Sequence, residues 1–244
     1  PYFHSLKENC VTGYTYASIV GGQTANTEFE LLTGNTLGFL SAGTTAFQLY
    51  IHGQMPSLVS NLKAEGYSGN KAMHPFNPYN YNRPAVYKDF GFTDFIDKFD
   101  FPKNVKRVRE YISDEANVDR IISEYEKNRK KTDQPFYMYN MTIQNHSPYD
   151  KDAANFKQPI KIESSKYDAE ANRYLNLIKY SDDSLKQLTS YFEKCKEPTI
   201  ILFLGDHQPR LTDEFMNKIT NGQYQTWSSE QMMKRYQVPF VIWV

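Results

Sequence analysis

The feature that most constrains the fold of this chain is the apolar run between Pro198 and Gly205, which is followed directly by Asp206 and His207. Such a run predicts a strand buried on both faces, as in the parallel sheets of α/β proteins. Open α/β sheets build their sites at the carboxyl ends of strands. Asp206 and His207 offer an oxygen and a nitrogen donor, which suit Zn²⁺ or Mn²⁺. The alternative is a turn in which Asp206 caps the loop and His207 is only a polar residue.

The rest of the chain alternates between strand and helix patterns. Apolar and β-branched segments predict further strands at 12–20, shortly after 67, and at 92–95, 135–143 and 238–244. Helical spacing and capping residues predict helices at 57–67, 85–90, 113–125, 166–194 and 231–235. The alternation predicts an α/β fold with a largely parallel central sheet and helices on both faces.

The long helix predicted at 166–194 is expected to cover the sheet and to carry no chemistry. Asp182 and Asp183 on it resemble a carboxylate dyad, but a solvated polar face is the better interpretation. Its apolar stripe, which is expected to face the core, comprises Ala171, Leu175, Ile178, Leu185, Leu188 and Phe192.

The composition is that of a globular chain without affinity for nucleic acid. The 244 residues, 40% hydrophobic and 23% charged, fit one α/β domain. The 28 basic and 28 acidic residues cancel, and no basic run is interleaved with aromatic residues, so nucleic acid is excluded as a partner. Cys10 and Cys195 are too few for a disulfide framework and lack a zinc-binding spacing.

Both ends of the chain look cut. No strand precedes the loop near Thr24, and the last residues form a strand pattern with nothing after it. No apolar run approaches the roughly 20 residues of a membrane span. We therefore expect residues 1–244 to be a single catalytic domain truncated at both ends, which is soluble as a fragment and comes from a longer protein whose other segments can hold a membrane anchor.

A glycine turn, Gly21-Gly22, leads into a helical pattern that begins near Thr24. Backbone N–H groups and the positive end of the helix dipole at such a terminus favour an anion or a developing alkoxide. Thr24 is therefore a candidate nucleophile, although a threonine that only caps the helix fits the same pattern.

Two loops carry further polar candidates. The segment from His74 to Pro84 is rich in proline, asparagine and aromatic residues, and its Arg83 has the planar guanidinium that suits phosphate. A rigid surface loop has the same composition. His146 follows the strand predicted at 135–143, so it is presented at a strand's carboxyl end, as His207 is.

Four motifs taken together resemble the lipoteichoic acid synthase and phosphoglycerol transferase family, in the sulfatase-like branch of the alkaline phosphatase superfamily. They follow the family's order over nearly the whole chain and contain Thr24, Arg83, His146 and the pair Asp206-His207: Gly-Gly-Gln-Thr-Ala-Asn-Thr-Glu-Phe-Glu, Tyr-Asn-Arg, Gln-Asn-His-Ser-Pro-Tyr and Phe-Leu-Gly-Asp-His-Gln-Pro.

The resemblance implies an extracellular catalytic domain tethered to the cell membrane by segments outside this chain. It implies a Mn-type divalent ion, with Zn or Mg as alternatives. It also implies a threonine-linked intermediate in the transfer of glycerol phosphate from the headgroup of phosphatidylglycerol. The acceptor in the family is a glycan or a growing polyglycerolphosphate polymer.

Carried over by motif, Thr24 is the nucleophile and a metal ligand, and Asp206 and His207 are further metal ligands. The same resemblance assigns substrate binding to four residues: Arg83, His146, His74 and Tyr81. The family's first metal-binding acid lies upstream of the threonine loop, and this chain starts too late to contain it. The resemblance therefore also implies that the chain alone is catalytically incomplete.

Two alternatives stay open. One is a hydrolase of the same superfamily, such as a phosphodiesterase or a sulfatase, or a phosphoethanolamine transferase. A sulfatase needs a cysteine or serine in a C/S-x-P-x-R pattern, and the loop at Thr24 has neither. The other is a non-catalytic domain that binds anionic glycans, with which the 15% aromatic content is compatible.

Overall fold

The computed structural model describes residues 1–220 and 222–244, which divide into two compact units. Unit 1 comprises Pro1–Gly22, Arg107–Glu110 and Gln144–Val244. Unit 2 comprises Gln23–Lys106 and Tyr111–Ile143.

Unit 2 is built on a parallel sheet. Strand β2 (Ser68–Met73) lies between β3 (Asp94–Ile96) and β6 (Phe136–Asn140), and both neighbours run parallel to it. The strands predicted shortly after 67, at 92–95 and at 135–143 are thus present. They form the parallel sheet that the alternation of strands and helices predicts.

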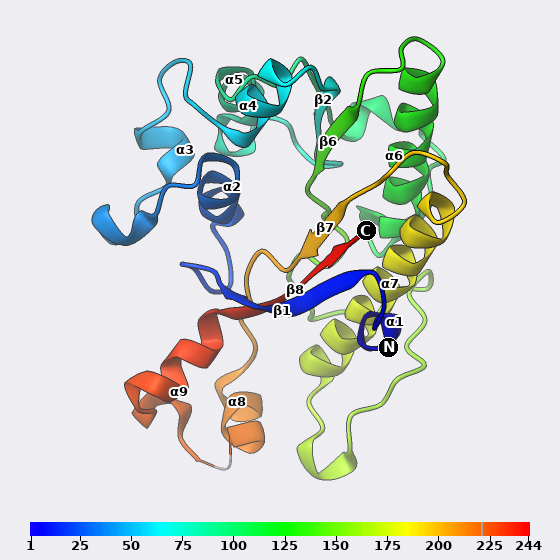
Figure 1. The fold of residues 1–244 in the computed structure, drawn as a ribbon. Helices are drawn as coiled ribbons and strands as arrows, with labels where there is room; N and C mark the ends of the chain where they lie inside the picture. Colours follow the sequence, from blue (N-terminus) through cyan, green and yellow to red (C-terminus); the bar gives the residue numbers. More distant parts are fainter. Residues whose placement is uncertain (221) are drawn as a thin grey trace. The chain divides into compact units, whose positions relative to one another are not determined.

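Helices cover both faces of this sheet (Figure 1). Ala72 of β2 packs in one core with helices α2 (Thr24–Thr33), α3 (Ala46–Leu49), α4 (Leu58–Ala64) and α5 (Arg83–Asp89). The next residue, Met73, packs in a second core with α6 (Asp114–Arg129). Successive side chains of a strand point to opposite faces, so the sheet separates the two cores.

The helix boundaries in unit 2 follow the capping residues. Ser57 accepts a hydrogen bond from the backbone N–H of Ser60 at the start of α4, and Ser113 accepts one from Ala116 at the start of α6. The remaining elements of this unit are short: the 3-10 helices η1 (Leu37–Phe39), η2 (Asn80–Asn82) and η3 (Lys98–Asp100), and β5 (Tyr111–Ile112).

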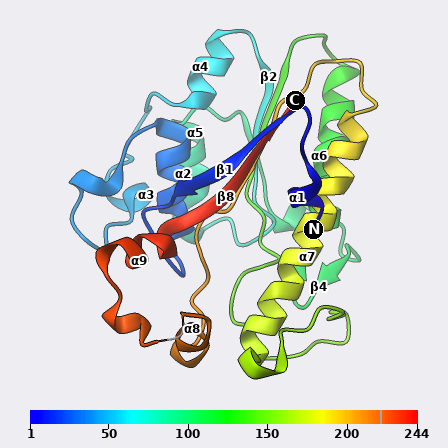
Figure 2. The same ribbon diagram turned by 60° about the horizontal axis from the view of Figure 1, so that its bottom comes forward.

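Unit 1 contains an antiparallel sheet. Strand β8 (Gln237–Trp243) lies between β1 (Cys10–Tyr16) and β7 (Ile201–Leu204), and Figure 2 shows β1 and β8 side by side. The prediction that β7 is buried on both faces is wrong. Ile200 and Leu202, which share one face, are 72% and 47% exposed. The other residues of β7, Ile201, Phe203 and Leu204, are partly buried.

Helix α7 (Ala169–Phe192) is the long helix that the sequence predicts, with Asp168 as its N-cap. Two details differ from expectation. Leu175 and Ile178 of the predicted stripe are 37% and 40% exposed, whereas Leu177, outside the stripe, is fully buried. Asp182 is not solvated surface.

The Asp182 carboxylate is 8% exposed and accepts hydrogen bonds from the backbone N–H groups of Tyr2 and Phe3, at 2.6 and 2.7 Å. It therefore satisfies the first turn of α1 (Tyr2–Ser5), whose amide groups have no partner within that helix. The other elements of unit 1 are β4 (Arg107–Val108), η4 (Ser164–Lys166), α8 (Asp213–Thr220), η5 (Tyr224–Thr226), α9 (Ser229–Met233) and η6 (Lys234–Tyr236). In residues 1–220 and 222–244, none of the helices has the length and apolar character that crossing a bilayer requires.

Candidate active-site residues

Thr24 is the first residue of α2 in unit 2, as the sequence predicts. The turn before it is left-handed, with φ of 72° at Gly21, 155° at Gly22 and 62° at Gln23. Glycine adopts such values without the steric cost that other residues meet. The first turn of α2 carries no acidic side chain, so its positive dipole end is not compensated from within the helix. Thr24 is partly exposed.

Arg83 is also in unit 2, but its guanidinium is enclosed in the protein. The side chain is 2% exposed, and its Nε and Nη2 atoms donate to Oε1 of Glu28 at 3.2 and 2.5 Å. Nη1 donates to the backbone oxygen of Asn80 at 3.4 Å, and the Tyr81 ring centroid lies 5.1 Å from Cζ. The sequence indicated a guanidinium open to phosphate, whereas in the structure one edge is already occupied by a carboxylate.

Glu28 has both carboxylate oxygens engaged. It is fully buried, and its second oxygen accepts a short hydrogen bond from the Tyr87 hydroxyl. Burial and the nearby Glu28 charge raise the pKa of Tyr87 well above its usual value, so Tyr87 stays a proton donor. Burial alone would lower the pKa of Arg83, but the charge of Glu28 raises it. Glu28 is therefore an internal partner of Arg83 and not a vacant metal ligand.

His74 and Tyr81 belong to the same loop region of unit 2. His74 is 3% exposed, and its Nδ1 lies 3.0 Å from the backbone oxygen of Met141. A carbonyl oxygen only accepts, so the proton is on Nδ1. Tyr81 and Asn82 both have positive φ, 59° and 57°, a conformation that costs non-glycine residues energy.

Asp206 and His207 follow β7 in unit 1. The Asp206 Oδ2 atom lies 3.1 Å from Nε2 of His207, and Nδ1 lies 2.9 Å from the backbone oxygen of Gln208. Both ring nitrogens thus face oxygen acceptors, whereas a neutral imidazole donates from only one nitrogen. A cation between the carboxylate and Nε2 would satisfy both groups, so this pair fits a divalent metal.

A complete metal centre does not follow from this pair alone. Among the residues that the structure describes, no group of three or more His, Cys, Asp or Glu side chains lies together. Zinc and similar ions take four or more ligands. Asp206 and His207 therefore supply a partial set of donors.

His146, in unit 1, lies in an exposed loop that Arg109 holds in place. Arg109 donates to three backbone oxygens of this loop, those of Gln144, His146 and Pro148, at 2.8, 2.7 and 2.6 Å. Its Cζ lies 5.8 Å from the centre of the Tyr149 ring. Sequence reasoning missed Arg109, because an arginine that binds distant backbone oxygens leaves no local pattern.

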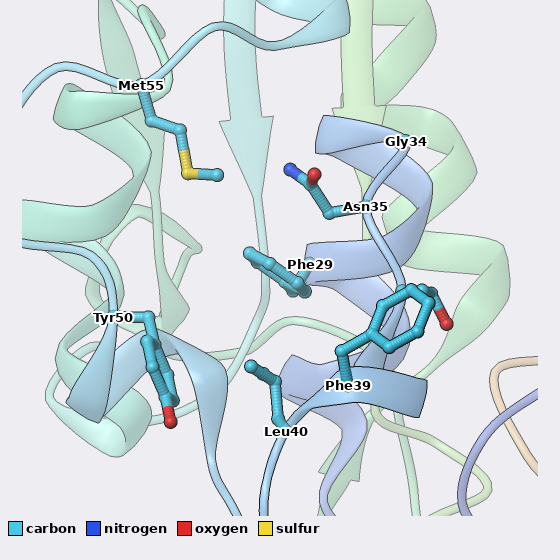
Figure 3. Close-up of a pocket in the computed structure, with 8 residues that line it drawn as sticks. Phe29, Gly34, Asn35, Phe39, Leu40, Tyr50 and Met55 are labelled. Atoms are coloured by element: carbon cyan, nitrogen blue, oxygen red, sulfur yellow. The ribbon is translucent and has the colours of Figure 1, made fainter.

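A cavity of about 520 Å³ lies beside the carboxyl end of α2 in unit 2 (Figure 3). Its lining is largely apolar, with Phe29, Phe39, Tyr50 and Met55 among its residues. None of the predicted site residues lines it. Because the predicted site residues lie elsewhere, this largely apolar cavity is not part of the candidate site.

Comparison with known proteins places the chain in a family. The sequence model of the sulfatase family matches residues 1–244. A protein of Rhizobium meliloti described as a putative cyclic beta-1,2-glucan modification protein is 34% identical over 239 residues, which are 95% of this chain and 36% of that protein. The lipoteichoic acid synthase of Staphylococcus aureus is 28% identical over 196 residues, 76% of this chain and 28% of that enzyme.

Solved structures agree on the fold. The lipoteichoic acid synthase LtaP from Listeria monocytogenes superposes with a TM-score of 0.78 at 23% identity, covering 99% of this chain and 58% of that one. The phosphoglycerol transferase GacH from Streptococcus pyogenes, solved with sn-glycerol-1-phosphate, gives a TM-score of 0.75 at 21% identity, covering 100% and 60%. The chain spans about a third of the length of the curated relatives that it matches.

These findings confirm the α/β fold of the alkaline phosphatase type and the resemblance to lipoteichoic acid synthases. The family model matches every residue of the chain, which is stronger evidence than similarity to individual proteins. The chain belongs to the sulfatase family.

Proposed function

We propose that this chain is the catalytic part of a metal-dependent transferase that moves glycerol phosphate from phosphatidylglycerol to an acceptor. The observation that carries the proposal is Thr24, a hydroxyl at the start of a helix whose first turn has no acidic side chain, in a chain with lipoteichoic acid synthases among its relatives. The hydroxyl is a nucleophile only when a base, an ion or a dipole stabilises its alkoxide.

Thr24 is proposed as nucleophile and metal ligand, with Asp206 and His207 as further ligands. Their oxygen and nitrogen donors suit Mn²⁺, with Zn²⁺ or Mg²⁺ as alternatives. When bound, the ion would lower the free energy of the Thr24 alkoxide. The chain's own contribution is the α2 dipole, which stabilises negative charge at Thr24, and the Gln208 backbone oxygen, which accepts from Nδ1 of His207 and so turns Nε2 toward the ion.

Arg83, His74, Tyr81 and His146 are proposed as substrate-binding residues. Donors on Arg83 and His146 would neutralise charge on the phosphoryl oxygens. His74 holds its Nδ1 proton toward Met141, so its Nε2 is the nitrogen suited to accept from a glycerol hydroxyl. The GacH complex supports a glycerol phosphate ligand for this fold.

The acceptor is proposed to be a glycan or a polyglycerolphosphate chain. The name of the Rhizobium relative, which refers to a cyclic glucan, supports the glycan. Because the family's synthases act on a lipid, we place the reaction at the extracellular face of the cell membrane, with anchoring by segments outside this chain.

Release of diacylglycerol from labelled phosphatidylglycerol tests the proposal. Thr24→Ala should abolish release and leave the fold intact, since loss of a helix-terminal hydroxyl costs about 1 kcal/mol. Thr33→Ala is the matched control, because it removes a hydroxyl from the opposite end of the same helix. Near-normal release by Thr24→Ala would contradict the nucleophile assignment.

Calorimetric titration with Mn²⁺ tests the ligand set. The 244-residue chain should bind the ion weakly, and Asp206→Asn should remove the remaining affinity. Undiminished affinity in Asp206→Asn would show that the ligand assignment is wrong, because Glu28 is already committed to Arg83 and cannot replace the lost donor.

A further inference from the structure

Glu28 occupies a position that links two residues of the proposed site. It lies on α2 four residues after Thr24, and side chains with this spacing share one face of a helix. It is also bonded to Arg83, which is 55 residues away in the sequence. A single carboxylate therefore connects the helix of the proposed nucleophile with the proposed phosphate-binding arginine, within unit 2.

The contacts fix the orientation of the guanidinium. Glu28 takes the Nε–Nη2 edge of Arg83, and Nη1 is turned toward the backbone of Asn80. The Nη1 group that Glu28 leaves over lies by the Asn80 backbone, and the Tyr81 ring centroid lies 5.1 Å from Cζ. Bidentate binding of phosphate depends on such a fixed plane, since the guanidinium offers its N–H groups in a rigid fork.

Stability alone is a poor account of this arrangement. A fully buried ion pair gains little net free energy, because the cost of removing both charges from water offsets their attraction. Glu28 and Arg83 are 0% and 2% exposed. The Tyr87 hydroxyl satisfies the remaining carboxylate oxygen, so the Glu28 carboxylate is held from two sides by helix α5.

We propose that Glu28 is a positioning residue, which orients the Arg83 guanidinium toward a phosphate ester and holds it in register with Thr24. The inference rests on the proposed function. It names the chemical class of the ligand, a glycerol phosphate monoester or diester, and the carboxylate that prepares its binding site. Glu28 does not touch the substrate and acts only through Arg83.

The test is calorimetric binding of sn-glycerol-1-phosphate to the full chain with Mn²⁺ present. Glu28→Asp keeps the charge but shortens the side chain by one methylene, so it should pull the guanidinium from its place and weaken binding about tenfold, because a charge-assisted hydrogen bond depends on its geometry. Glu28→Gln should weaken binding further. In a turnover assay, both should raise KM for the phospholipid more than they lower kcat.

Glu124→Gln is the matched control for stability. It also removes a buried carboxylate from an ion cluster of unit 2, but that cluster contains none of the proposed site residues. It should lower Tm and leave the affinity for glycerol phosphate unchanged. If Glu28→Gln fails to fold, Glu28→Asp carries the test, and wild-type affinity in Glu28→Asp would overturn the proposal.

The outcomes separate this inference from the proposed function. If the wild-type chain binds glycerol phosphate and both Glu28 variants bind it equally well, only the positioning role is wrong. If the wild-type chain binds no glycerol phosphate, the proposed function fails and the positioning role fails with it. If the Glu28 variants lose affinity while the Glu124 variant keeps it, the positioning role is supported.

Discussion

Two of the buried carboxylates of unit 2, those of Glu28 and Glu124, have surroundings that differ. Glu124, 4% exposed, pairs with Lys71, Arg120 and Lys127 at 2.9, 3.0 and 3.0 Å. Glu28, with no exposed surface, pairs with a single cation, Arg83. The partners of Glu124 reach solvent, with Lys127 57% exposed, whereas Arg83 is 2% exposed.

The difference concerns what each cluster can tolerate. A cation of the Glu124 cluster that loses its partner can extend into water, since lysine and arginine carry long flexible stems. Arg83 has no such route, and among the described contacts Glu28 is the carboxylate that balances its charge. The Glu124 cluster therefore resembles a surface ion network that joins α6 to β2. The Glu28 cluster is an enclosed ion pair with a fixed geometry.

The largest effect is expected at Glu28. Glu28→Gln leaves an uncompensated guanidinium in the interior and should lower the free energy of unfolding by about 3–5 kcal/mol. Urea denaturation of wild type and variant measures the difference. A smaller loss of unfolding free energy in Glu28→Gln than in Glu124→Gln would contradict the proposed difference between the two clusters.

Removing the carboxylate of Glu124 should cost about 2 kcal/mol, because the hydrogen bonds of a charged group are lost but its partners can hydrate. The effect should depend on pH. Burial alone would raise the pKa of Glu124, but hydrogen bonds from Lys71 and Lys127 lower it to about 2 from 4.5. Its stabilising contribution is therefore complete above about pH 4.5 and is lost as the pH falls toward 2.

Thermal unfolding of wild type and Glu124→Gln should be measured over roughly pH 2 to 6, a range that spans the two pKa values of Glu124. The difference in Tm between the two proteins should shrink on acidification. A difference that stays constant over this range would mean that the carboxylate of Glu124 is not the group that titrates.

Tyr87→Phe should have a smaller effect at the Glu28 cluster. It removes the hydroxyl donor and leaves the ion pair intact, so we expect a loss of about 1.5 kcal/mol from one charge-assisted hydrogen bond. Chemical denaturation of Tyr87→Phe alone and with Glu28→Gln measures the coupling. Strict additivity of the two losses would argue against the hydrogen bond.

The smallest effect is expected at Lys127, the most exposed partner of Glu124. Lys127→Ala should change the free energy of unfolding by less than about 0.5 kcal/mol, as for other exposed helix pairs. The same denaturation assay detects a larger change. A loss of 2 kcal/mol or more, on the order of a buried charged hydrogen bond, would show that the network is not a surface feature.

The sequence predicted well what depends on local spacing. Ser57 and Ser113 stand at the starts of helices, as the helical patterns there predict. The placement of Thr24 at the start of a helix also follows from its neighbours, Gly21 and Gly22.

Long-range pairing escaped prediction. Nothing near Arg83 indicates that Glu28, 55 residues earlier, occupies its fork. Asp182 is a charged residue on a long polar helix, and its burial comes from two backbone groups at the other end of the chain. An apolar run predicts burial, but the exposure of Leu202 depends on which strands flank it, and periodicity contains no such information.

The antiparallel sheet of unit 1 has a consequence for biosynthesis. Strand β1 pairs with β8 along its whole length, from Cys10 with Trp243 to Tyr16 with Gln237. The ribosome adds residues in order, so β1 leaves it long before β8 is synthesised. The hydrogen-bonding edge of β1 therefore stays unpaired during that time, and closing the long loop between β1 and β8 is slow. Unit 2 contains no residue beyond Ile143, so all of its residues are synthesised before β8 is. The exposed tyrosines of β1, Tyr14 and Tyr16, are then the segment that most needs protection from aggregation while translation continues.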